Sequence, residues 1–418
     1  MKKVLLTIMI LFSSLLLISC KEKEKDTLVV GMEAAYAPFN WTVLQKTEYS
    51  YPISNQKGSY ADGYDVQIAK LIASNLNKKL VIKAIEWDGL LPALASKEID
   101  VIIAGMSPTE ERKKEIAFTN IYYRSEIVMI VNNNGKYVNA NSLTDFSGAR
   151  IVAQRGTLYD NLISQIDNVI HQQPLDTYSA IANAVSSNTS DGFVAELPVA
   201  KSVVNANKNL KIVYFAENSG FNLDEDDITV AIGLRKGDTK LLEDINNSLA
   251  KIDDNTRNTI MEEAVMRSED DVTHGILSIF VKYFKLFLQG TLITIMLAIT
   301  GTLGGFILSL LLVSLTNTVI DKKRNSKITI FFKKLGKAFA NFYITIMRGT
   351  PMIIQAMIFY YGIQSIVTLK FWTPLLASII IVILNTSAYI AEIIRGSVNA
   401  LDKGQYEASI ALGMSRRQ

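Results

Sequence analysis

Few residues of this chain have the types and spacing that covalent, redox or metal chemistry requires. The chain has one cysteine, Cys20, and two histidines, His171 and His274, which lie far apart in the sequence. A single cysteine excludes an internal disulfide and a cysteine-rich metal cluster, and two distant histidines disfavour a histidine metal site. The sequence contains no phosphate loop of the form G-x-x-x-x-G-K-[ST]. We therefore expect neither a metal site nor nucleotide hydrolysis by the chain itself.

Charge divides the 418 residues into an acidic part and a basic part. The formal net charge is +3, yet residues 276–418 hold 15 basic and four acidic residues, which leaves 28 basic and 36 acidic residues in 1–275. The hydrophobic content of 49% and the mean hydropathy of +0.20 are high for a soluble protein, and the excess lies in the basic part. Because the soluble-looking part is acidic, nucleic acid is excluded as a partner.

The first twenty residues have the pattern of a secretory signal. Lys2 and Lys3 precede an apolar run at 4–18, which is shorter than the roughly 20 residues of a spanning helix. The ending Leu-Ile-Ser-Cys resembles a bacterial lipobox, which implies cleavage before Cys20 and attachment of a lipid to its sulfur. On this interpretation 1–19 is a lipoprotein signal peptide and 20–26 a charged tether. An uncleaved anchor or an ordinary signal with an incidental cysteine is the alternative.

Alternating strand and helix patterns predict an α/β domain over 27–268. Such alternation favours parallel sheets with helices on both faces, and these sheets bind ligands at the carboxyl ends of their strands. The expected strands cover 27–31, 80–85, 100–104, 126–131, 150–153 and 192–195, and the expected helices cover 65–76, 89–96, 158–166 and 178–186.

Six motifs in this region resemble the polar amino acid binding proteins of bacterial ABC importers. They are GMEAAYAPFNW (31–41), ADGYDV (61–66), WDGLLPAL (87–94), AGMSPTEER (104–112), IAFTNIYY (116–123) and DGFVAELP (191–198). The resemblance implies an α/β two-lobed domain of the periplasmic-binding-protein-like type II class. Its hinge is expected near 124–131 and 213–218, and its lobes are expected to close around one free polar amino acid.

The same resemblance assigns the two charged ends of that amino acid. Arg112 is expected to bind the carboxylate, because a planar guanidinium donates two parallel hydrogen bonds. Ser107 matches the hydroxyl that donates to the same carboxylate, and the carbonyl of Gly105 is expected to accept from the ammonium group. Glu196 matches the acidic partner of that ammonium, at a position where the family usually has aspartate. The alternatives are a surface charge at Arg112 and an exposed loop acid at Glu196.

Four further residues match positions around the ligand side chain. Tyr36 and Trp87 correspond to an aromatic pair that sandwiches it, with cation–π attraction if the ligand is cationic. Gln154 and Thr157 correspond to contacts from the second lobe. The next residue is often small and polar in the family, but here it is Leu158, so one hydrogen bond is expected to be missing.

Glu33 bears on the class of amino acid. Family members that take lysine, arginine or ornithine have an acid at this position, which meets the cationic end of the ligand. The resemblance therefore favours arginine or lysine slightly over glutamine. A solvated acid at the mouth of the cleft is the alternative interpretation of Glu33.

Residues 286–418 are predicted to be a membrane domain, after a linker at 269–285. Spans are expected at about 286–315, 338–363 and 375–394, each at least as long as the roughly 20 residues that a crossing needs. The basic stretch 321–337 is expected in the cytoplasm, in agreement with an exported first domain and one crossing. A GxxxG pattern begins at Gly301; it either permits close helix contact or reflects the general frequency of glycine in spanning helices.

Four motifs of this region resemble the permease subunits of the same importers. They are QGTLIT (289–294), RGTP (348–351), NTSAYIAEIIRG (385–396) and GQYEASIALG (404–413). The last corresponds to the cytoplasmic EAA loop, expected at 404–418 and incomplete at its end. In the family this loop forms a short helix that docks on the ATPase, and Glu407, Ala408 and Gly413 match its hallmark positions.

Together these patterns predict a fused subunit of an amino acid ABC importer. It is expected to be a multi-pass protein of the bacterial cytoplasmic membrane, in contact with lipid, with its solute-binding domain on the external face. Its expected partners are cytoplasmic ATPase subunits, which use the ATP, and a second copy or a paired permease subunit. It is not expected to be an enzyme or to hold a cofactor. The alternative is an amino acid receptor or a ligand-gated channel component without transport.

Overall fold

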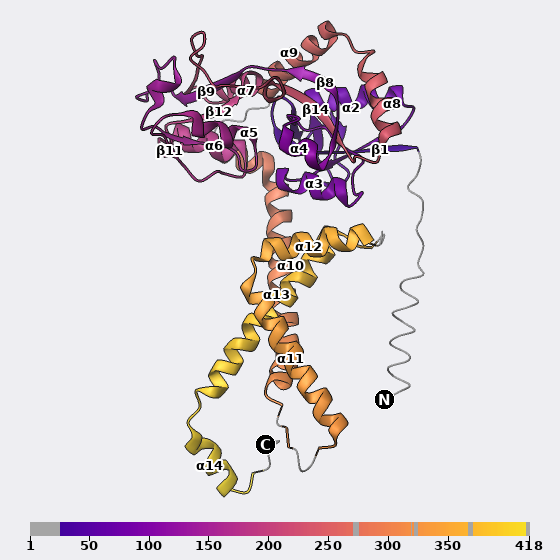
Figure 1. Ribbon diagram of the computed structural model, residues 1–418, viewed down its shortest axis with the longest axis vertical. Coiled ribbons are helices and arrows are strands. Elements are labelled where there is room, and N and C mark those ends of the chain that lie inside the picture. Colours follow the sequence, from indigo (N-terminus) through magenta and orange to yellow (C-terminus); the bar gives the residue numbers. More distant parts are fainter. Residues whose placement is uncertain (1–25, 271–275, 319, 322–324, 367–370, 415–418) are drawn as a thin grey trace. The chain divides into compact units, whose positions relative to one another are not determined.

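The computed structural model of the protein describes residues 26–270, 276–318, 320–321, 325–366 and 371–414 (Figure 1). They fall into two compact units, Met1–His274 and Gly275–Gln418, and each unit is considered by itself below. The predicted signal peptide at 1–19, the lipidation site Cys20 and all but the last residue of the predicted tether lie outside the described residues.

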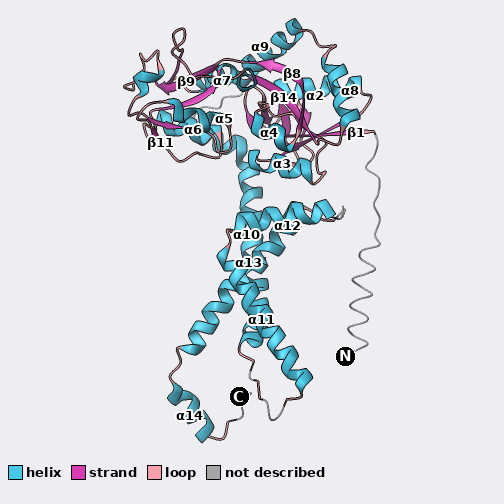
Figure 2. Cartoon of the chain, in the orientation of Figure 1, coloured by secondary structure: helices cyan, strands magenta, loops and turns pink. Residues whose placement is uncertain are grey.

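The first unit contains two five-stranded sheets, each with helices packed on it (Figure 2). We call the halves built on these sheets lobe 1 and lobe 2. The sheet of lobe 1 has the order β6-β1-β7-β14-β8. Its strands are β1 (Thr27–Met32), β6 (Lys79–Ala84), β7 (Val101–Ile102), β8 (Ala117–Arg124) and β14 (Thr229–Leu234). The sheet of lobe 2 has the order β11-β10-β12-β9-β13. Its strands are β9 (Ile127–Asn132), β10 (Arg150–Val152), β11 (Ile170–His171), β12 (Gly192–Glu196) and β13 (Leu210–Val213).

Both sheets are mixed, so the prediction of purely parallel sheets is wrong. Strands β1, β6 and β7 are mutually parallel, as are β10, β11 and β12, but β14 is antiparallel to β7 and β8, and β9 is antiparallel to β12 and β13. The reversed strands are those that carry the chain from one lobe to the other. Residues 125–126 join β8 to β9, and 214–228 join β13 to β14, without the crossover helix that a parallel pair needs.

Helices cover the sheets where the sequence has apolar residues at helical spacing. In α2 (Tyr64–Asn75) the buried residues include Val66, Ile68, Ala69 and Ile72, which is the stripe that the periodicity predicts. The other helices of lobe 1 are α3 (Trp87–Ala95), α4 (Glu110–Glu115), α8 (Thr239–Leu249) and α9 (Asp254–Asp270), and those of lobe 2 are α5 (Leu158–Leu162), α6 (Tyr178–Ser186) and α7 (Leu197–Ala206).

A small antiparallel sheet in lobe 1 was not expected from the sequence. Its order is β2-β3-β5-β4, with β2 (Ala35–Tyr36), β3 (Asn40–Val43), β4 (Tyr51–Pro52) and β5 (Tyr60–Asp62). Its strands are two to four residues long, too short for a visible alternation of polar and apolar residues. This sheet positions Tyr36 and Asn40, both of which are buried.

The last helix of the first unit, α9, is attached to both lobes. Arg267 forms a two-pronged ion pair with the buried Asp62 of lobe 1, with N–O distances of 3.1 and 3.3 Å, and its guanidinium lies 4.0 Å from the ring centroid of Tyr49. The neighbouring Ser268 hydroxyl lies 2.9 Å from that of Ser202 in α7 of lobe 2. The C-terminal turn of α9 therefore contacts both lobe 1 and lobe 2.

The second unit is helical in its described residues. Its helices are α10 (Ile276–Thr316), α11 (Lys327–Gly349), α12 (Met352–Ile366), α13 (Pro374–Asn399) and α14 (Lys403–Ala411). By length and composition, Leu277–Thr316 and Pro374–Asn399 are suited to cross a membrane, and the bent pair α11–α12 would make a third crossing if it acts as one span.

The predicted second span, at 338–363, contains a break. Helix α11 ends at Gly349 and α12 begins at Met352, with a bend of 110° between them. Pro351 has no N–H for the carbonyl of Met347, four residues earlier, which breaks the helix. That carbonyl accepts instead from the side-chain amides of Gln355 at 3.0 Å and Asn385 at 3.2 Å. Two amide side chains thus replace the missing backbone donor where water is scarce.

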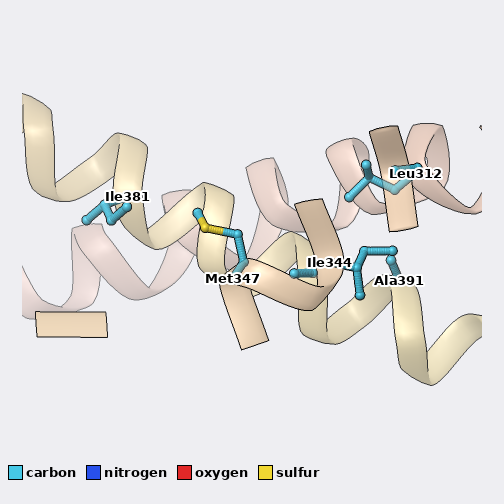
Figure 3. Packing of buried hydrophobic residues seen from close by; sticks show 7 residues of the cluster. Leu312, Ile344, Met347, Ile381 and Ala391 are labelled. Carbon is cyan, nitrogen blue, oxygen red and sulfur yellow. The ribbon is translucent and has the colours of Figure 1, made fainter. Parts of the chain in front are cut away.

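Helices α10 and α13 pack closely through glycines. A Cβ at Gly304 would lie 2.8 Å from Ile383, and one at Gly305 would lie 3.0 Å from Thr386, so larger residues do not fit without movement. The interpretation of the GxxxG pattern as a close-contact surface is therefore correct. Buried apolar side chains from α10, α11 and α13 form the core of the unit, among them Leu312, Ile344, Met347 and Ile381 (Figure 3).

Candidate functional site

A small cavity between the lobes contains most of the predicted ligand-binding residues. Its free volume is only about 20 Å³, so the lobes leave little empty space between them. From lobe 1 it is lined by Glu33, Tyr36, Trp87, Gly105, Ser107 and Arg112, and from lobe 2 by Gln154 and Thr157. Three of these residues lie within three positions of the carboxyl ends of parallel strands: Glu33 follows β1, Trp87 follows β6 and Gln154 follows β10. Crevices outside the carboxyl ends of strands are where open α/β sheets place ligands.

Arg112 is a cation without an acidic partner in the part of the chain that the structure describes. Its guanidinium donates to the backbone carbonyls of Ser107 at 2.9 Å and Gly156 at 3.2 Å, and it lies 5.1 Å from the ring centroid of Trp87. No ion pair to a described carboxylate is formed, and burial lowers the pKa of Arg112 below its ordinary value. A guanidinium whose pKa is lowered in this way has lost water without gaining enough stabilisation from neighbouring negative groups. The arrangement suits an anion that enters from the cavity.

Glu33 lies inside the cleft rather than in solvent at its mouth. It is 9% exposed, and burial raises the pKa of its carboxyl group to about 7, with a smaller opposing effect from Gln154. Its two oxygens accept from the amide nitrogen of Gln154 at 3.1 and 3.3 Å. A carboxyl group that is stripped of water in this way is stabilised as an anion by any cation that approaches it.

Glu196 is the one predicted ligand-binding residue that does not line the cavity. It is 2% exposed at the end of β12, and its Oε1 accepts from the hydroxyls of Tyr36 and Tyr159, at 3.1 Å in the case of Tyr36. Its Oε2 is buried without a hydrogen-bond partner among the described residues. Burial raises the pKa of Glu196 to about 7 as well. A second acid therefore lies directly behind the tyrosine hydroxyls of the cleft.

Several contacts join the lobes across the cavity. Besides the Glu33–Gln154 and Tyr36–Glu196 hydrogen bonds, the indole N–H of Trp87 donates to the carbonyl of Gly156 at 3.2 Å. These contacts use the same groups that the sequence assigns to the ligand. The lobes are therefore closed on one another through polar groups that a small molecule would have to take over.

The smaller residues of the site hold its backbone. Gly105 has a left-handed φ of +60°, and a Cβ there would lie 2.8 Å from Cε1 of Tyr36, so both the conformation and the space require glycine. Thr157 donates its hydroxyl to the carbonyl of Gln154 at 2.7 Å. Ser107 is 5% exposed and contributes its carbonyl to Arg112. These residues shape the loops that carry the charged groups.

Three lining residues were not predicted as ligand contacts: Leu158, Tyr159 and Tyr178. Burial first, and then the Glu196 carboxylate, raise the pKa of Tyr159 and Tyr178 well above the ordinary tyrosine value, so both hydroxyls keep their protons. The sequence does carry a signal for them, because each lies within the first turns of a helix that follows a lobe 2 strand. Tyr159 supplies a hydroxyl one residue after the apolar Leu158.

The second candidate site is the short helix α14 of the second unit. Asp402 caps its N-terminus by accepting from the backbone N–H of Gly404 at 2.7 Å. Glu407 and Ala408 are exposed on the helix, and Gly413 follows it with a left-handed φ of +75°. The predicted EAA segment is thus a capped helix that ends in a glycine turn, while its last four residues lie outside the described residues.

Two protein families match the chain in succession. The sequence model of the bacterial extracellular solute-binding proteins, family 3, matches residues 28–265. The model of the binding-protein-dependent transport system inner membrane component matches residues 326–418. The first match covers both lobes except Thr27 and the last residues of α9, and it includes every residue that lines the cavity.

Curated relatives divide in the same way. The chain is 30% identical over 232 residues to the "Probable histidine-binding protein" of Campylobacter jejuni subsp. jejuni, which is 53% of this chain and 83% of that protein. It is 25% identical over 242 residues to the arginine-binding extracellular protein ArtP of Bacillus subtilis, which is 57% of this chain and 85% of the relative. It is 34% identical over 128 residues to the "Putative glutamine transport system permease protein GlnP" of Rickettsia felis, which is 31% of this chain and 52% of the relative. The chain thus spans about half of that permease relative.

Proposed function

The chain belongs to family 3 of the bacterial extracellular solute-binding proteins, and from this premise we propose that its first unit captures a basic amino acid, arginine or lysine, in preference to glutamine. The first unit has the type II periplasmic-binding-protein fold, and the second carries an inner-membrane transport component. The relatives' names, which include an arginine-binding protein and a glutamine permease, support amino acids as the class of solute.

The observation that carries the proposal is the set of charges around the cavity. The cavity is lined by one guanidinium, Arg112, and one carboxyl group, Glu33, and neither forms an ion pair among the described residues. A second carboxyl group, Glu196, lies behind the hydroxyls of Tyr36 and Tyr159. A basic amino acid brings one carboxylate for Arg112 and a side-chain cation for Glu33. A neutral amino acid would leave Glu33 buried without a counter-charge, which costs free energy.

The aromatic rings of the site also favour a cation. Tyr36 and Tyr178 lie with ring centroids 4.8 Å apart, and the ring of Trp87 already carries the Arg112 guanidinium at 5.1 Å. Rings next to a cavity attract a cation by about 0.5–2 kcal/mol, depending on how much water is excluded. The closed, polar arrangement binds a solute and offers no group poised for covalent chemistry among the described residues.

For the second unit we propose a part in ATP-driven import. The unit would form part of the translocation path in the cytoplasmic membrane, as a homodimer or as one of a pair of permease subunits, with the first unit on the external face. Its exposed helix α14, with Glu407 and Ala408, would dock on a separate ATPase subunit, which hydrolyses the ATP. The exposure of these residues and the helix-in-groove mode of recognition support this assignment.

Calorimetry of the full chain in detergent, against each of the twenty amino acids, tests the capture function. We expect arginine or lysine to bind tightest. Glu33→Gln should weaken arginine binding far more than glutamine binding, because it removes the charge that meets the cationic end of the arginine side chain. Glu243→Gln is the matched control, since Glu243 is an exposed acid of α8 and is not among the charges that raise the Glu33 pKa. Equal effects of Glu33→Gln on both ligands would exclude Glu33 as the specificity residue.

Uptake measurements separate transport from the alternative of a receptor or channel component. The full chain, reconstituted in vesicles with its ATPase partner, should accumulate labelled arginine only when ATP is present on the ATPase side. Glu407→Lys should abolish accumulation without changing arginine affinity. Ligand binding without uptake, or ATP-independent ion flow on ligand addition, would instead support the receptor or the channel.

A further inference from the structure

A chain of buried hydrogen bonds lies beneath the cleft, outside the set of ligand contacts. Its centre is Asp65 in the first turn of α2, which is fully buried. Its Oδ1 accepts from the hydroxyl of Tyr122 at 2.6 Å, and its Oδ2 accepts from the side-chain amide of Asn40 at 2.7 Å. All three side chains are 0% exposed. None of them lines the cavity, so the proposed function leaves this acid unexplained.

Both ends of this chain reach the backbone of the site. The hydroxyl oxygen of Tyr122 accepts from the N–H of Gly105 at 3.3 Å, and the amide oxygen of Asn40 accepts from the N–H of Ala34 at 2.7 Å. Gly105 lines the cavity, and Ala34 directly follows Glu33. One carboxylate thus connects the two lobe 1 loops that carry binding groups.

These two backbone positions are ones that need support. Ala34 has a φ of +57° and Gly105 a φ of +60°, both in the left-handed region. For a residue with a Cβ, such as Ala34, this conformation is strained. Such a conformation persists only where the surroundings hold it, and here the Asn40 side chain occupies the N–H of Ala34.

While Asp65 is ionised, the donors and acceptors of the chain have only one arrangement. A carboxylate accepts and does not donate, so Asn40 must present its NH2 group to Asp65 and its oxygen to Ala34. For the same reason Tyr122 must give its one proton to Asp65, which leaves its oxygen lone pairs for the N–H of Gly105. The charge of Asp65 therefore fixes the direction of every bond out to the site.

We propose that Asp65 is a positioning residue for ligand binding, which acts through Asn40 and Tyr122 to fix the backbone at Ala34 and Gly105. The role rests on the proposed function, because it sets where the Glu33 carboxyl group and the Gly105 carbonyl face the ligand. The competing explanation is that Asp65 and its partners only support the core of lobe 1. The two explanations differ in whether loss of the network changes affinity or only stability.

Removal of one hydroxyl separates them. Tyr122→Phe deletes the bond to Gly105, whereas Tyr64→Phe deletes an equally buried hydroxyl, which donates to the backbone carbonyl of Tyr122 at 2.8 Å and does not belong to the network. The measurement is L-arginine calorimetry of the full chain in detergent at pH 8.5, where Asp65, with a pKa of about 7 owing to its burial, is ionised. We expect Tyr122→Phe to weaken binding about tenfold or more, and Tyr64→Phe to change it about twofold at most. Equal losses in the two variants would overturn the proposal.

An exchange of the two polar partners provides a rescue test. Asp65→Asn turns an NH2 group toward that of Asn40, and Asn40→Asp turns a carboxylate toward that of Asp65, so each single change breaks the pairing. The double variant Asn40→Asp/Asp65→Asn restores it: the new amide donates to the new carboxylate, whose other oxygen still accepts from Ala34. We expect each single variant to lose about tenfold in arginine affinity and the double variant to recover most of it. Losses that simply add in the double variant would contradict the proposal.

Amide hydrogen exchange without ligand keeps this test independent of the proposed function. Tyr122→Phe should speed exchange at Gly105, and Asn40→Ala should speed it at Ala34, while Tyr64→Phe should leave both unchanged. If the parent chain bound none of the twenty amino acids, the proposed function would fail, and the exchange rates would still decide the positioning role. Unchanged exchange at both amides would overturn that role whatever the ligand.

Discussion

The preference for arginine over its uncharged isostere citrulline should depend on pH through Glu33. The two ligands have nearly the same size and differ in the charge at the end of the side chain. On the proposed function Arg112 acts on the amino acid group that both ligands share, so its contribution cancels in the ratio of the two affinities. The ratio therefore isolates the interaction between Glu33 and the cationic end.

The size of the effect follows from the raised pKa of Glu33. Burial raises that pKa to about 7, so the ligand-free site holds a proton on Glu33 at acid pH, and a cationic ligand must release it. The ionised fraction falls from about one half at pH 7 to about 3% at pH 5.5, so the affinity ratio should fall about 16-fold, or about 1.6 kcal/mol. Above pH 8.5 the ratio should be constant. The sign is fixed, because a cation stabilises the carboxylate and not the acid.

Calorimetry of both ligands between pH 5.5 and 8.5, in the full chain, measures the ratio. Arginine should release more protons than citrulline near pH 7, which appears as a dependence of the binding enthalpy on the buffer. In Glu33→Gln the ratio should be small and independent of pH, and Glu243→Gln, at an exposed acid of α8, should retain the parent profile. A flat ratio in the parent chain would refute the reasoning, because it would mean that Glu33 does not meet the charged end of the ligand.

Three other changes test separate parts of the structure. Arg112→Ala should weaken arginine binding by about 3–5 kcal/mol in calorimetry, since it leaves the ligand carboxylate buried without a counter-charge. Arg112→Lys should lose less binding free energy. An unchanged affinity in Arg112→Ala would remove this residue from the site. Gln355→Leu should lower the melting temperature in detergent and the free energy of unfolding by about 1–2 kcal/mol, because it removes a donor from the Met347 carbonyl at the α11–α12 bend. Gln364→Leu, on the same helix, should have little effect. Similar shifts in both variants would argue against the bend as the cause. Arg267→Met should lower the melting temperature of the first unit and its free energy of unfolding by about 2–3 kcal/mol, since Asp62 is left buried and unpaired. Glu263 is an exposed partner of the same arginine at 3.7 Å, so Glu263→Gln should cost about 0.5 kcal/mol or less. A parent-like melting curve for Arg267→Met would show that the pair adds nothing.

Much of the fold could be predicted because its elements are long enough to show a period. Strand β6 and helix α6 lie within one or two residues of their expected limits, and α2 buries the apolar stripe that its sequence predicts. The short strands of the small sheet escaped prediction, as two to four residues carry no period. The bend at Pro351 was signalled by proline, but a continuous apolar run masked it.

The site residues that belong to recognisable sequence motifs could be predicted. Eight of the nine predicted ligand residues line one cavity, although 121 positions separate Glu33 from Gln154. Tyr159 and Tyr178 were missed because an aromatic residue early in a helix is more often part of the core. Glu196 was placed in contact with the ligand, whereas in the structure two tyrosine hydroxyls lie between it and the cavity. Only the folded chain brings those hydroxyls to one carboxylate.

The two units are consecutive in one polypeptide, and only residues 271–275 separate α9 from α10. Every copy of the membrane unit therefore has its own solute-binding unit, in a ratio that translation sets at one to one. Encounter between the two is intramolecular, and short connections of this kind give effective concentrations of the order of millimolar. Raising the expression of such a chain therefore raises the numbers of solute-binding units and membrane units together.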